Sequence, residues 1–567
     1  MLLTNNEQFQ QIREEIQKAK ILALDTETTW LEKHDPESLR KLLGLAITTS
    51  QNSWYIPVGH LPFGGIPQQN FVIPSDLFID FSGPIIAHNM KFDYNVLEKA
   101  GIKLPTGALE CTMMQSVYID ENHKPVGHEL DEVLTKYLGE KKKKIEKKAM
   151  KAFGWESAPT HYMAEYAIQD VQHLPQLREK LLSKTEAKHV KLWENVDRRF
   201  MLLLAEIERR GLPINRTLCE SLDQKCDIRL DEIQQELGFD PAKPTQLHPK
   251  LFADPPLGLG LKVPSRTPKT GVPQVSLSWL AGQGHPVCAL IHEYRKTAKQ
   301  RSSYFSSYLR LTTRDDPILY PTFKQHGTET GRLSCEKPNL QQIPREEWKD
   351  AYVKKLFLPT TGRQLWEVDF RTIEYRLAAV YAQSRILLEL FEAEGDFHQL
   401  VADDVSAQAG VSIGRQQAKT INYLMSFGGG IEVLQKQLGV SYSIAAKIHA
   451  GYKKAYWEIF ARADDAQAVA EQYGQIDMWS GRTRHFQYPS EYRSAFNSII
   501  QGGAFEIVKR SMLKAHDAGA CIVNQVHDSI WLDVDSEADT IEIQNIMEGW
   551  TKAAFGLSFR MDRKRLN

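Results

Sequence analysis

The sequence predicts a multidomain protein that combines α/β and α+β architecture, and three observations support this fold class. The chain has 567 residues, which at about 150 residues per domain corresponds to roughly four domains. Residues 5–187 alternate short apolar runs with helical stretches, a pattern typical of an α/β domain. Residues 395–512 read as mainly helical, and residues 519–534 alternate around Asp528 as a β-hairpin does. A helix-rich α+β part is therefore expected after an α/β part.

The composition is that of a globular protein with balanced charge. Apolar residues make up 42% and charged residues 25%, and 70 Lys+Arg minus 71 Asp+Glu leaves a net charge of −1. The six cysteines have no zinc-site spacing, and no apolar run is long enough to span a bilayer. We therefore expect a reduced, cytoplasmic protein without a membrane partner. Residues 285–345 carry ten Lys+Arg against five Asp+Glu, so the neutral total does not exclude a polyanionic substrate.

The remaining elements follow in chain order. Residues 188–237 are helix-rich, residues 239–273 contain eight of the 26 prolines and predict a loop-rich tip, and residues 285–311 are helical again. The lysine-rich run at 141–151 predicts a solvated helix face or loop, with at most a minor role near a phosphate backbone. A short strand is expected to end at Asp369 and lead into a helix.

Four carboxylates and a tyrosine in the first part form a candidate metal site. Asp25 and Glu27 follow an apolar strand two residues apart, so both side chains leave the same face. Asp93 opens a helical pattern, and Tyr166 and Asp170 lie four residues apart on one helix face. Converging carboxylates require divalent cations, and oxygen ligands favour Mg²⁺ or Mn²⁺. Two such ions can hydrolyse a phosphodiester, with Tyr166 orienting the attacking water.

A second carboxylate pair lies in the later part of the chain. Asp369 stands at a strand end and Asp528 at the tip of the predicted hairpin, and this pair again implies two hard metal ions. Between them, a helix carries a stripe with four-residue spacing that matches a nucleoside triphosphate, with cations for the phosphates and aromatic rings for sugar and base. The stripe consists of Arg415, Lys419, Tyr423 and Phe427.

The ordered motifs resemble two known families. The first set resembles the DEDDy 3′→5′ exonucleases over about 190 residues, which implies a ribonuclease H-like domain. The order Asp369 to Arg376, Arg415 to Gly428, and His527 with Asp528 resembles motifs A, B and C of family A DNA polymerases. Residues 293–304, 328–344 and 493–512 match the same family. The resemblance implies a right-hand polymerase of palm, fingers and thumb that follows the exonuclease domain.

This resemblance implies template-directed DNA synthesis with proofreading. Asp369, Phe370 and Asp528 would hold the polymerase metals, and Asp25, Glu27, Asp93 and Asp170 those of the exonuclease, with two Mg²⁺ or Mn²⁺ ions per active site. The dNTP would be bound by Arg415, Lys419, Tyr423, Phe427 and His398, while Glu374 would exclude a ribose 2′ hydroxyl. Primer-template DNA would be contacted by a set of polar side chains, several of them in its minor groove, where donors check pair shape without reading sequence. These DNA-binding residues are Arg332, Asn339, Gln341, Arg493, Asn497, Gln501 and His527.

Three positions depart from the common family pattern. Ser529 replaces the acidic residue that often follows the motif C aspartate, which predicts altered metal tuning but not inactivity. Arg371 has no explanation in the sequence. Phe427 stands where tyrosine is frequent, which removes a hydroxyl near the templating base.

The expected domains are an exonuclease at 1–190, a connection at 191–211, a thumb at 212–315, palm segments at 316–394 and 505–567, and fingers at 395–504. The partners implied are primer-template DNA, dNTPs and a single-stranded 3′ end in the exonuclease site, with a monomeric enzyme and no processivity partner identified. Only 24 residues precede Asp25, so we expect no 5′ nuclease domain and a role in phage DNA replication in the host cytoplasm.

Three alternative functions account for fewer of these residues. A ribonuclease D type exonuclease would not need Asp369, Asp528 or the stripe. A single-subunit RNA polymerase is disfavoured by Glu374 and the exonuclease motifs, and a noncatalytic relative by the six metal carboxylates.

Overall fold

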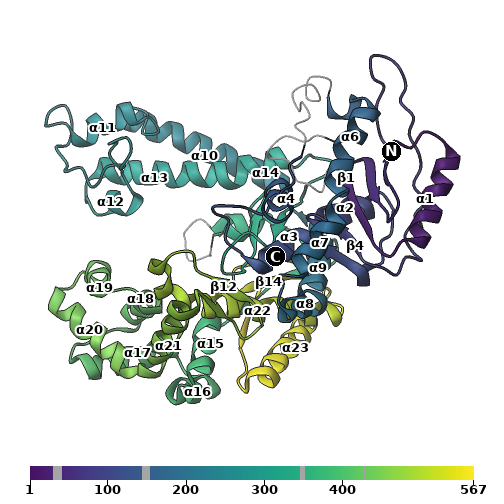
Figure 1. Ribbon diagram of the computed structural model, residues 1–567. Coiled ribbons are helices and arrows are strands. Elements are labelled where there is room, and N and C mark those ends of the chain that lie inside the picture. Colours follow the sequence, from purple (N-terminus) through teal and green to yellow (C-terminus); the bar gives the residue numbers. More distant parts are fainter. Residues whose placement is uncertain (30–40, 143–153, 345–350, 427) are drawn as a thin grey trace. The chain divides into compact units, whose positions relative to one another are not determined.

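The computed structural model describes residues 1–29, 41–142, 154–344, 351–426 and 428–567. The chain forms two compact units, whose elements are labelled in Figure 1. The first unit comprises Met1–Gly211, Tyr320–Gln342 and Thr361–Arg565, and the second comprises Leu212–Leu319, Ile343–Thr360 and Leu566–Asn567. Mixed sheets and helices in the first unit confirm the predicted α/β and α+β fold class.

The N-terminal part of the first unit is built on a five-stranded sheet of order β3-β2-β1-β4-β5. Strands β1, β2 and β3 pair antiparallel, whereas β4 pairs parallel with both β1 and β5. The strands are β1 (Leu22–Thr28), β2 (Leu42–Thr48), β3 (Ser53–Pro57), β4 (Ile85–Ala87) and β5 (Leu109–Cys111). The helices are α1 (Asn6–Lys18), α2 (Met90–Lys99), α3 (Thr112–Ile119), α4 (Leu130–Leu138), α6 (Thr160–Val171) and α7 (Leu174–Leu182).

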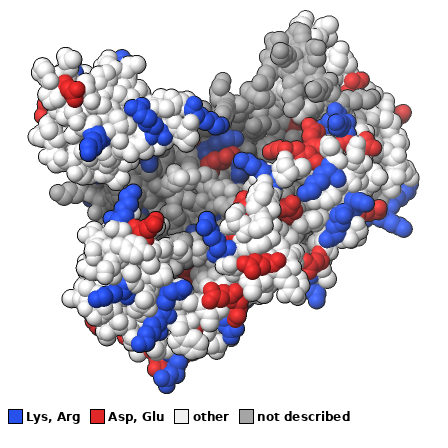
Figure 2. All heavy atoms as spheres, turned by 60° about the vertical axis from the view of Figure 1, so that its left-hand side comes forward, with Lys and Arg blue, Asp and Glu red and all other residues white. Residues whose placement is uncertain are grey.

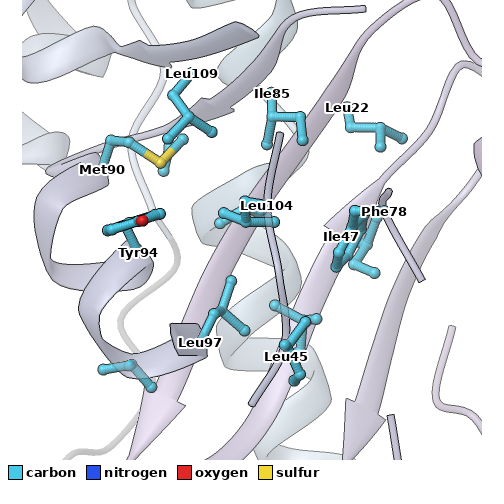
Figure 3. Packing of buried hydrophobic residues seen from close by; sticks show 14 of the residues in the cluster. Leu22, Leu45, Ile47, Phe78, Ile85, Met90, Tyr94, Leu97, Leu104 and Leu109 are labelled. Carbon is cyan, nitrogen blue, oxygen red and sulfur yellow. The ribbon is translucent and has the colours of Figure 1, made fainter. Parts of the chain in front are cut away.

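Both faces of this sheet are buried, and alternation along the strands divides them between two cores. Leu22 and Leu24 of β1 join one core with residues of α1 and α2, while Ala23 between them joins the other with residues of α4, α6 and α7. Figure 3 shows part of the first core, where Met90, Tyr94 and Leu97 lie near Leu45 and Leu109. This packing fixes the face on which the polar residues of β1 emerge.

The C-terminal part of the first unit is built on a four-stranded antiparallel sheet of order β13-β14-β10-β15. Helix α23 packs against β10, β14 and β15. The strands are β10 (Gln364–Phe370), β13 (Ile522–Val526), β14 (Ser529–Val534) and β15 (Met561–Arg565), and the predicted hairpin around Asp528 is confirmed as β13 and β14. Smaller strands are β8 (Thr322–Lys324), β9 (Ser334–Glu336), β11 (Gln475–Asp477) and β12 (Thr483–His485).

Among the described residues, nine α-helices follow β10. They are α15 (Ile373–Ala382), α16 (Arg385–Glu392), α17 (Phe397–Ala409), α18 (Arg415–Ser426), α19 (Ile431–Leu438), α20 (Tyr442–Ala455), α21 (Trp457–Tyr473), α22 (Ala495–Asp517) and α23 (Glu537–Phe555). Of these, α17 to α22 make up most of residues 395–512, the stretch that was predicted to be helical. Helix α8 (Ala187–Leu192), a π-helical turn (Trp193–Asp197) and α9 (Arg198–Arg210) connect the two parts of the unit.

A buried ionic cluster joins these two parts. Asp197 at the end of the π-helical turn accepts the hydroxyl of Tyr118 from α3 at 2.5 Å. Arg482 donates to Asp197 at 2.7 Å and to Glu506 at 3.0 Å, and Lys509 pairs with both carboxylates at 2.6 Å. We call Asp197, Arg482, Glu506 and Lys509 the ionic hub.

In its described residues, the second unit consists mainly of helices and loops, with the short strand pair β6 (Leu212–Pro213) and β7 (Ile318–Leu319). Its long helices α10 and α13 run side by side (Figure 1). The predicted loop-rich tip was wrong over Pro244–Phe252, which forms α11: Pro244 occupies the first turn, where no amide is needed, although Pro249 lies inside the helix. Its helices are α10 (Arg216–Leu237), α11, α12 (Leu277–Ala281), α13 (Pro286–Gln300) and α14 (Ser306–Leu311).

Charge on the surface matches the balanced composition. On the face of the molecule drawn in Figure 2, Lys and Arg side chains are interspersed with Asp and Glu. Among the described residues, no helix combines the length and apolar character needed to cross a membrane.

Candidate active sites

Three of the four carboxylates predicted for the first metal site come together at the N-terminal sheet, and the fourth lies close to them. Asp25 and Glu27 from β1 and Asp170 from α6 each place a ligand oxygen within 4.8 Å of the others. Asp93 from α2 is held beside them, because the backbone N–H and the hydroxyl of Thr26 both donate to its Oδ1 at 2.8 Å. We call Asp25, Glu27, Asp93, Tyr166 and Asp170 the β1–α6 site.

The negative charges of the carboxylates in this site repel one another. Burial, together with the charges of Asp93, Asp170 and Glu27, raises the pKa of Asp25 well above its ordinary value. Burial raises the pKa of Asp93 to about 7, although hydrogen bonds from Thr26 oppose this change. A divalent cation would relieve this repulsion, and an all-oxygen donor set suits Mg²⁺ or Mn²⁺. The residues present therefore fit the predicted metal site.

Tyr166 lies one helical turn before Asp170, as its spacing predicted. Its ring packs edge-on against Trp155, with centroids 5.6 Å apart. Burial, followed by the charges of Asp170 and Glu27, raises the pKa of the Tyr166 phenol. The phenol is therefore protonated at neutral pH and can orient a water molecule by hydrogen bonding.

Lys142 contacts this site, although the sequence did not single it out. Its Nζ lies 2.5 Å from Asp170 Oδ1 and 3.5 Å from Asp131 Oδ1, and only 19% of its side chain is exposed. The prediction of a solvated lysine run is therefore wrong at Lys142, while residues 143–151 of the run lie outside the described residues. No signal in a run of like residues could distinguish this lysine from its neighbours.

The second predicted pair meets at the end of β10. Asp369 is exposed near the end of that strand, and Asp528 lies in the tight turn between β13 and β14. The Phe370 amide donates to the Asp528 carbonyl at 3.3 Å, and Asp369 faces Ser529 across the two strands. We call Asp369, Phe370 and Asp528 the β10–β14 site. Two carboxylates carried by adjoining backbone segments can hold hard cations.

Glu374 and Arg332 form an ion pair beside this site. Burial raises the pKa of Glu374, the Arg332 charge lowers it, and the Asp528 charge raises it, which places the carboxylate in the electrostatic field of Asp528. Arg371, which the sequence left unexplained, pairs with Asp562 of β15 and donates from Nε at 2.6 Å. Arg371 therefore ties the turn after β10 to the neighbouring strand.

The cation–aromatic stripe lies on α18. Arg415, Lys419 and Tyr423 are exposed, whereas Ala418, Ile421 and Met425 on other sides of the helix are buried. Phe427 lies outside the described residues.

Neighbouring groups hold two of the predicted phosphate ligands. Arg415 donates to Asp396 at 2.7 Å, and the Asn422 amide lies 2.9 Å from His398 Nδ1. The stripe is therefore presented on one face, with its first cation held by a carboxylate at the start of α17.

The predicted DNA-binding residues fall into three groups. The side-chain amide of Gln341 donates to Gln525 Oε1 of β13 at 2.6 Å, and the backbone N–H of Gln341 donates to Asn339 Oδ1 at 3.0 Å. The adjacent His527 is exposed in the tight turn with a left-handed φ of 52°. Arg493 precedes α22, and Asn497 and Gln501 lie one turn apart on that helix, both half-buried. Arg332, in the ion pair with Glu374, makes up the third group.

Two family models match the two parts of the chain. The model for "DNA polymerase family A" matches residues 215–562, more than half of the chain, and the model for "3′-5′ exonuclease" matches residues 2–186. One solved structure, the POL domain of Pol1 from M. smegmatis in complex with DNA primer-template and dNTP, aligns with 100% of this chain and 98% of its own, with a TM-score of 0.82 at 20% identity. The TM-score shows that the two proteins share a fold, and at this low identity the likeness shows the fold alone.

Curated relatives agree with these matches. DNA polymerase I of Borreliella burgdorferi is 26% identical over 98% of the chain, and that of Pseudomonas aeruginosa is 25% identical over 94%. The chain spans only 63% and 61% of the length of these two proteins. DNA polymerase DpoZ of Acinetobacter phage SH-Ab 15497 is 27% identical over 82% of the chain and 84% of the phage protein. From the model that matches residues 215–562, the chain belongs to DNA polymerase family A.

Proposed function

We propose that this protein is a template-directed DNA polymerase with a proofreading 3′→5′ exonuclease. The observation that carries this proposal is the presence of two separate carboxylate sets, each built on its own sheet and each inside the stretch that matches the corresponding family. One site would add dNTPs to a primer 3′ hydroxyl, and the other would remove nucleotides from a single-stranded 3′ end.

In synthesis, the carboxylates of Asp369 and Asp528, with the backbone carbonyl of Phe370, would hold two divalent ions, Mg²⁺ or Mn²⁺. Bound there, such ions promote deprotonation of the attacking hydroxyl and neutralise charge on the departing pyrophosphate. The exposed cations of α18 receive the triphosphate, and Arg415 exchanges Asp396 for it. Tyr423 would face sugar and base, the role that the family resemblance also gives to Phe427, while His398 would add a ligand to the phosphates.

In hydrolysis, Asp25, Glu27, Asp93 and Asp170 would hold the metal pair. Thr26 fixes Asp93 through two hydrogen bonds, and the protonated Tyr166 phenol orients water. Lys142 lies against Asp170, so its ammonium offsets one negative charge where the phosphate of the DNA 3′ end must approach.

The same proposal assigns residues 1–190 to the exonuclease, 212–315 to the thumb, 395–504 to the fingers, and 316–394 with 505–567 to the palm. The proposed contacts to the primer-template minor groove are Arg332, Asn339, Asn497 and Gln501, and Gln341, Arg493 and His527 are the other proposed DNA-binding residues. The enzyme acts as a monomer in the cytoplasm. The phage relative DpoZ supports a role in phage DNA replication.

A labelled primer on a longer template tests the proposal. With Mg²⁺ and four dNTPs the native protein should lengthen the primer, and without dNTPs it should shorten it. EDTA should abolish both reactions, and added Mg²⁺ should restore them. Shortening without dNTP-dependent extension would indicate an exonuclease alone, and loss of both would indicate a noncatalytic relative.

Glu374→Ala should weaken discrimination against ribonucleotides. The Glu374 carboxylate is held by Arg332 beside Asp528, and its removal opens space for a 2′ hydroxyl. We expect the ratio of dNTP to rNTP incorporation efficiency to fall about tenfold or more, the size of one steric contact in a pocket. Single-nucleotide extension with each substrate measures this ratio. Glu392→Ala, at an exposed glutamate of α16, is the matched control, and an unchanged ratio in Glu374→Ala would contradict the assignment.

A further inference from the structure

We propose that Glu367 is a positioning residue of the β10–β14 site, whose carboxylate strengthens divalent-cation binding by Asp369 and Asp528 through the Ser529 hydroxyl. This inference rests on the proposed polymerase function and concerns a residue that the motifs do not include.

Strand geometry brings Glu367 to the metal-binding face. Glu367 and Asp369 are two residues apart on β10, so their side chains leave the same face of the sheet. The antiparallel register places Ser529 opposite Asp369 and Trp531 opposite Glu367. Directly opposed residues share a face, so all four side chains belong to the face of the sheet that carries Asp369, on which Ser529 and Trp531 are buried.

Hydrogen bonds fix the Glu367 carboxylate in this position. Ser529 donates from its hydroxyl to Glu367 Oε1 at 3.1 Å, and the buried Trp531 ring donates to the same oxygen at 3.2 Å. Ser529 directly follows Asp528, and its hydroxyl also lies 2.9 Å from the Val526 carbonyl. The carboxylate is therefore linked by one hydroxyl to the turn that holds Asp528.

Glu367 is proposed to act on the cations indirectly, without being a metal ligand itself. Among the described residues, it does not join Asp369 and Asp528 in a group whose ligand atoms all lie within 4.8 Å of one another. Its contribution is negative charge on the site's face and a fixed orientation of Ser529. Groups that orient metal ligands in this way typically contribute about ten- to a hundredfold in metal affinity or activity.

The competing explanation is that Glu367 serves only the fold. It could act solely as an acceptor for Ser529 and Trp531, or as the partner of Lys564, which lies opposite it on β15. Glu367→Gln separates these roles, because the amide oxygen still accepts both hydrogen bonds while the charge is lost. Lys564→Met removes the opposing cation and leaves Glu367 intact.

The experiment uses the full chain carrying Asp25→Asn and Asp170→Asn, so that the β1–α6 site does not contribute. Mn²⁺ binding is measured by electron paramagnetic resonance with a dideoxy-terminated primer-template and the next dNTP. We expect Glu367→Gln to weaken Mn²⁺ binding about tenfold or more and to raise the Mg²⁺ concentration needed for half-maximal extension. Lys564→Met should not weaken Mn²⁺ binding. Adding Ser529→Asp to Glu367→Gln should restore affinity, because it returns a carboxylate to the same face.

Unchanged Mn²⁺ affinity in Glu367→Gln, an equal loss in Lys564→Met, or no recovery in the double variant would overturn the inference. Absence of extension by the parent protein, in which the β10–β14 site is intact, would instead refute the proposed polymerase function. Circular dichroism and thermal unfolding of each variant establish that the fold is retained.

Discussion

Asp369→Asn should abolish primer extension and leave 3′→5′ degradation intact. Asp369 is exposed near the end of β10, so the isosteric amide keeps the fold while removing half of the carboxylate pair. Loss of about 4 kcal/mol of charge stabilisation in the transition state corresponds to about a thousandfold in rate. Single-turnover extension with a labelled primer measures this loss, and shortening without dNTPs measures the second activity.

Asp25→Asn is the reciprocal control and should remove degradation but not extension. The two carboxylate sets belong to different sheets of the first unit, so neither substitution alters the ligands of the other set. Asp25→Asn also relieves like-charge repulsion at a half-buried carboxylate, so it should not lower the unfolding temperature in EDTA. A folded Asp369→Asn protein that has lost both activities would contradict the separation of the sites.

Local periodicity predicted the parts of each site that lie within one element. The two-residue spacing of Asp25 and Glu27 on β1, and the four-residue spacing of Tyr166 and Asp170 on α6, follow directly from strand and helix geometry. The exposed stripe on α18 was predictable for the same reason. Long motifs then linked elements that are distant in sequence, which periodicity alone cannot do.

Features that depend on tertiary pairing were not predictable. The sequence shows that Glu367 lies two residues before Asp369, but the hydrogen bond between Glu367 and Ser529 depends on the β10–β14 register. Lys142 lies in a run of like residues, and only its contact with Asp170 distinguishes it. Arg371 gained an explanation only when β15 was found beside β10. In each case the informative fact is a contact between segments, which local sequence does not encode.

The ionic hub is a second case in which contacts between segments distant in sequence determine the properties of buried residues. Arg482 and Lys509 are separated from Asp197 by 285 and 312 residues, yet all are buried, with at most 7% of any side chain exposed among the four members. Burial by itself would raise the pKa of Asp197 and Glu506, but the charges of Lys509 and Arg482 outweigh it and lower both. Both carboxyls are therefore ionised at neutral pH, and their stabilising contribution is lost only as pH falls below their ordinary range.

Lys509→Met should destabilise the first unit by about 3–5 kcal/mol, the cost of removing one partner from a buried ionic cluster, although Arg482 still contacts both carboxylates. Lys509 bridges Asp197 of the connecting turn and Glu506 of α22, so its loss weakens the junction between the N-terminal and C-terminal parts. Urea unfolding at neutral pH, followed by circular dichroism, measures the change in free energy. Lys514→Met, at an exposed lysine of the same helix, is the matched control and should change stability by less than about 0.5 kcal/mol.

Asp197→Asn in the Lys509→Met background distinguishes the hub from simple packing. If the loss arises from uncompensated charge, removing the facing carboxylate should recover part of it, and the two effects should be less than additive. Additive losses, or a Lys509→Met effect no larger than that of Lys514→Met, would show that the hub contributes little to the junction. Recovery in the double variant would instead show that charge balance, more than packing volume, holds the exonuclease-like part against α22.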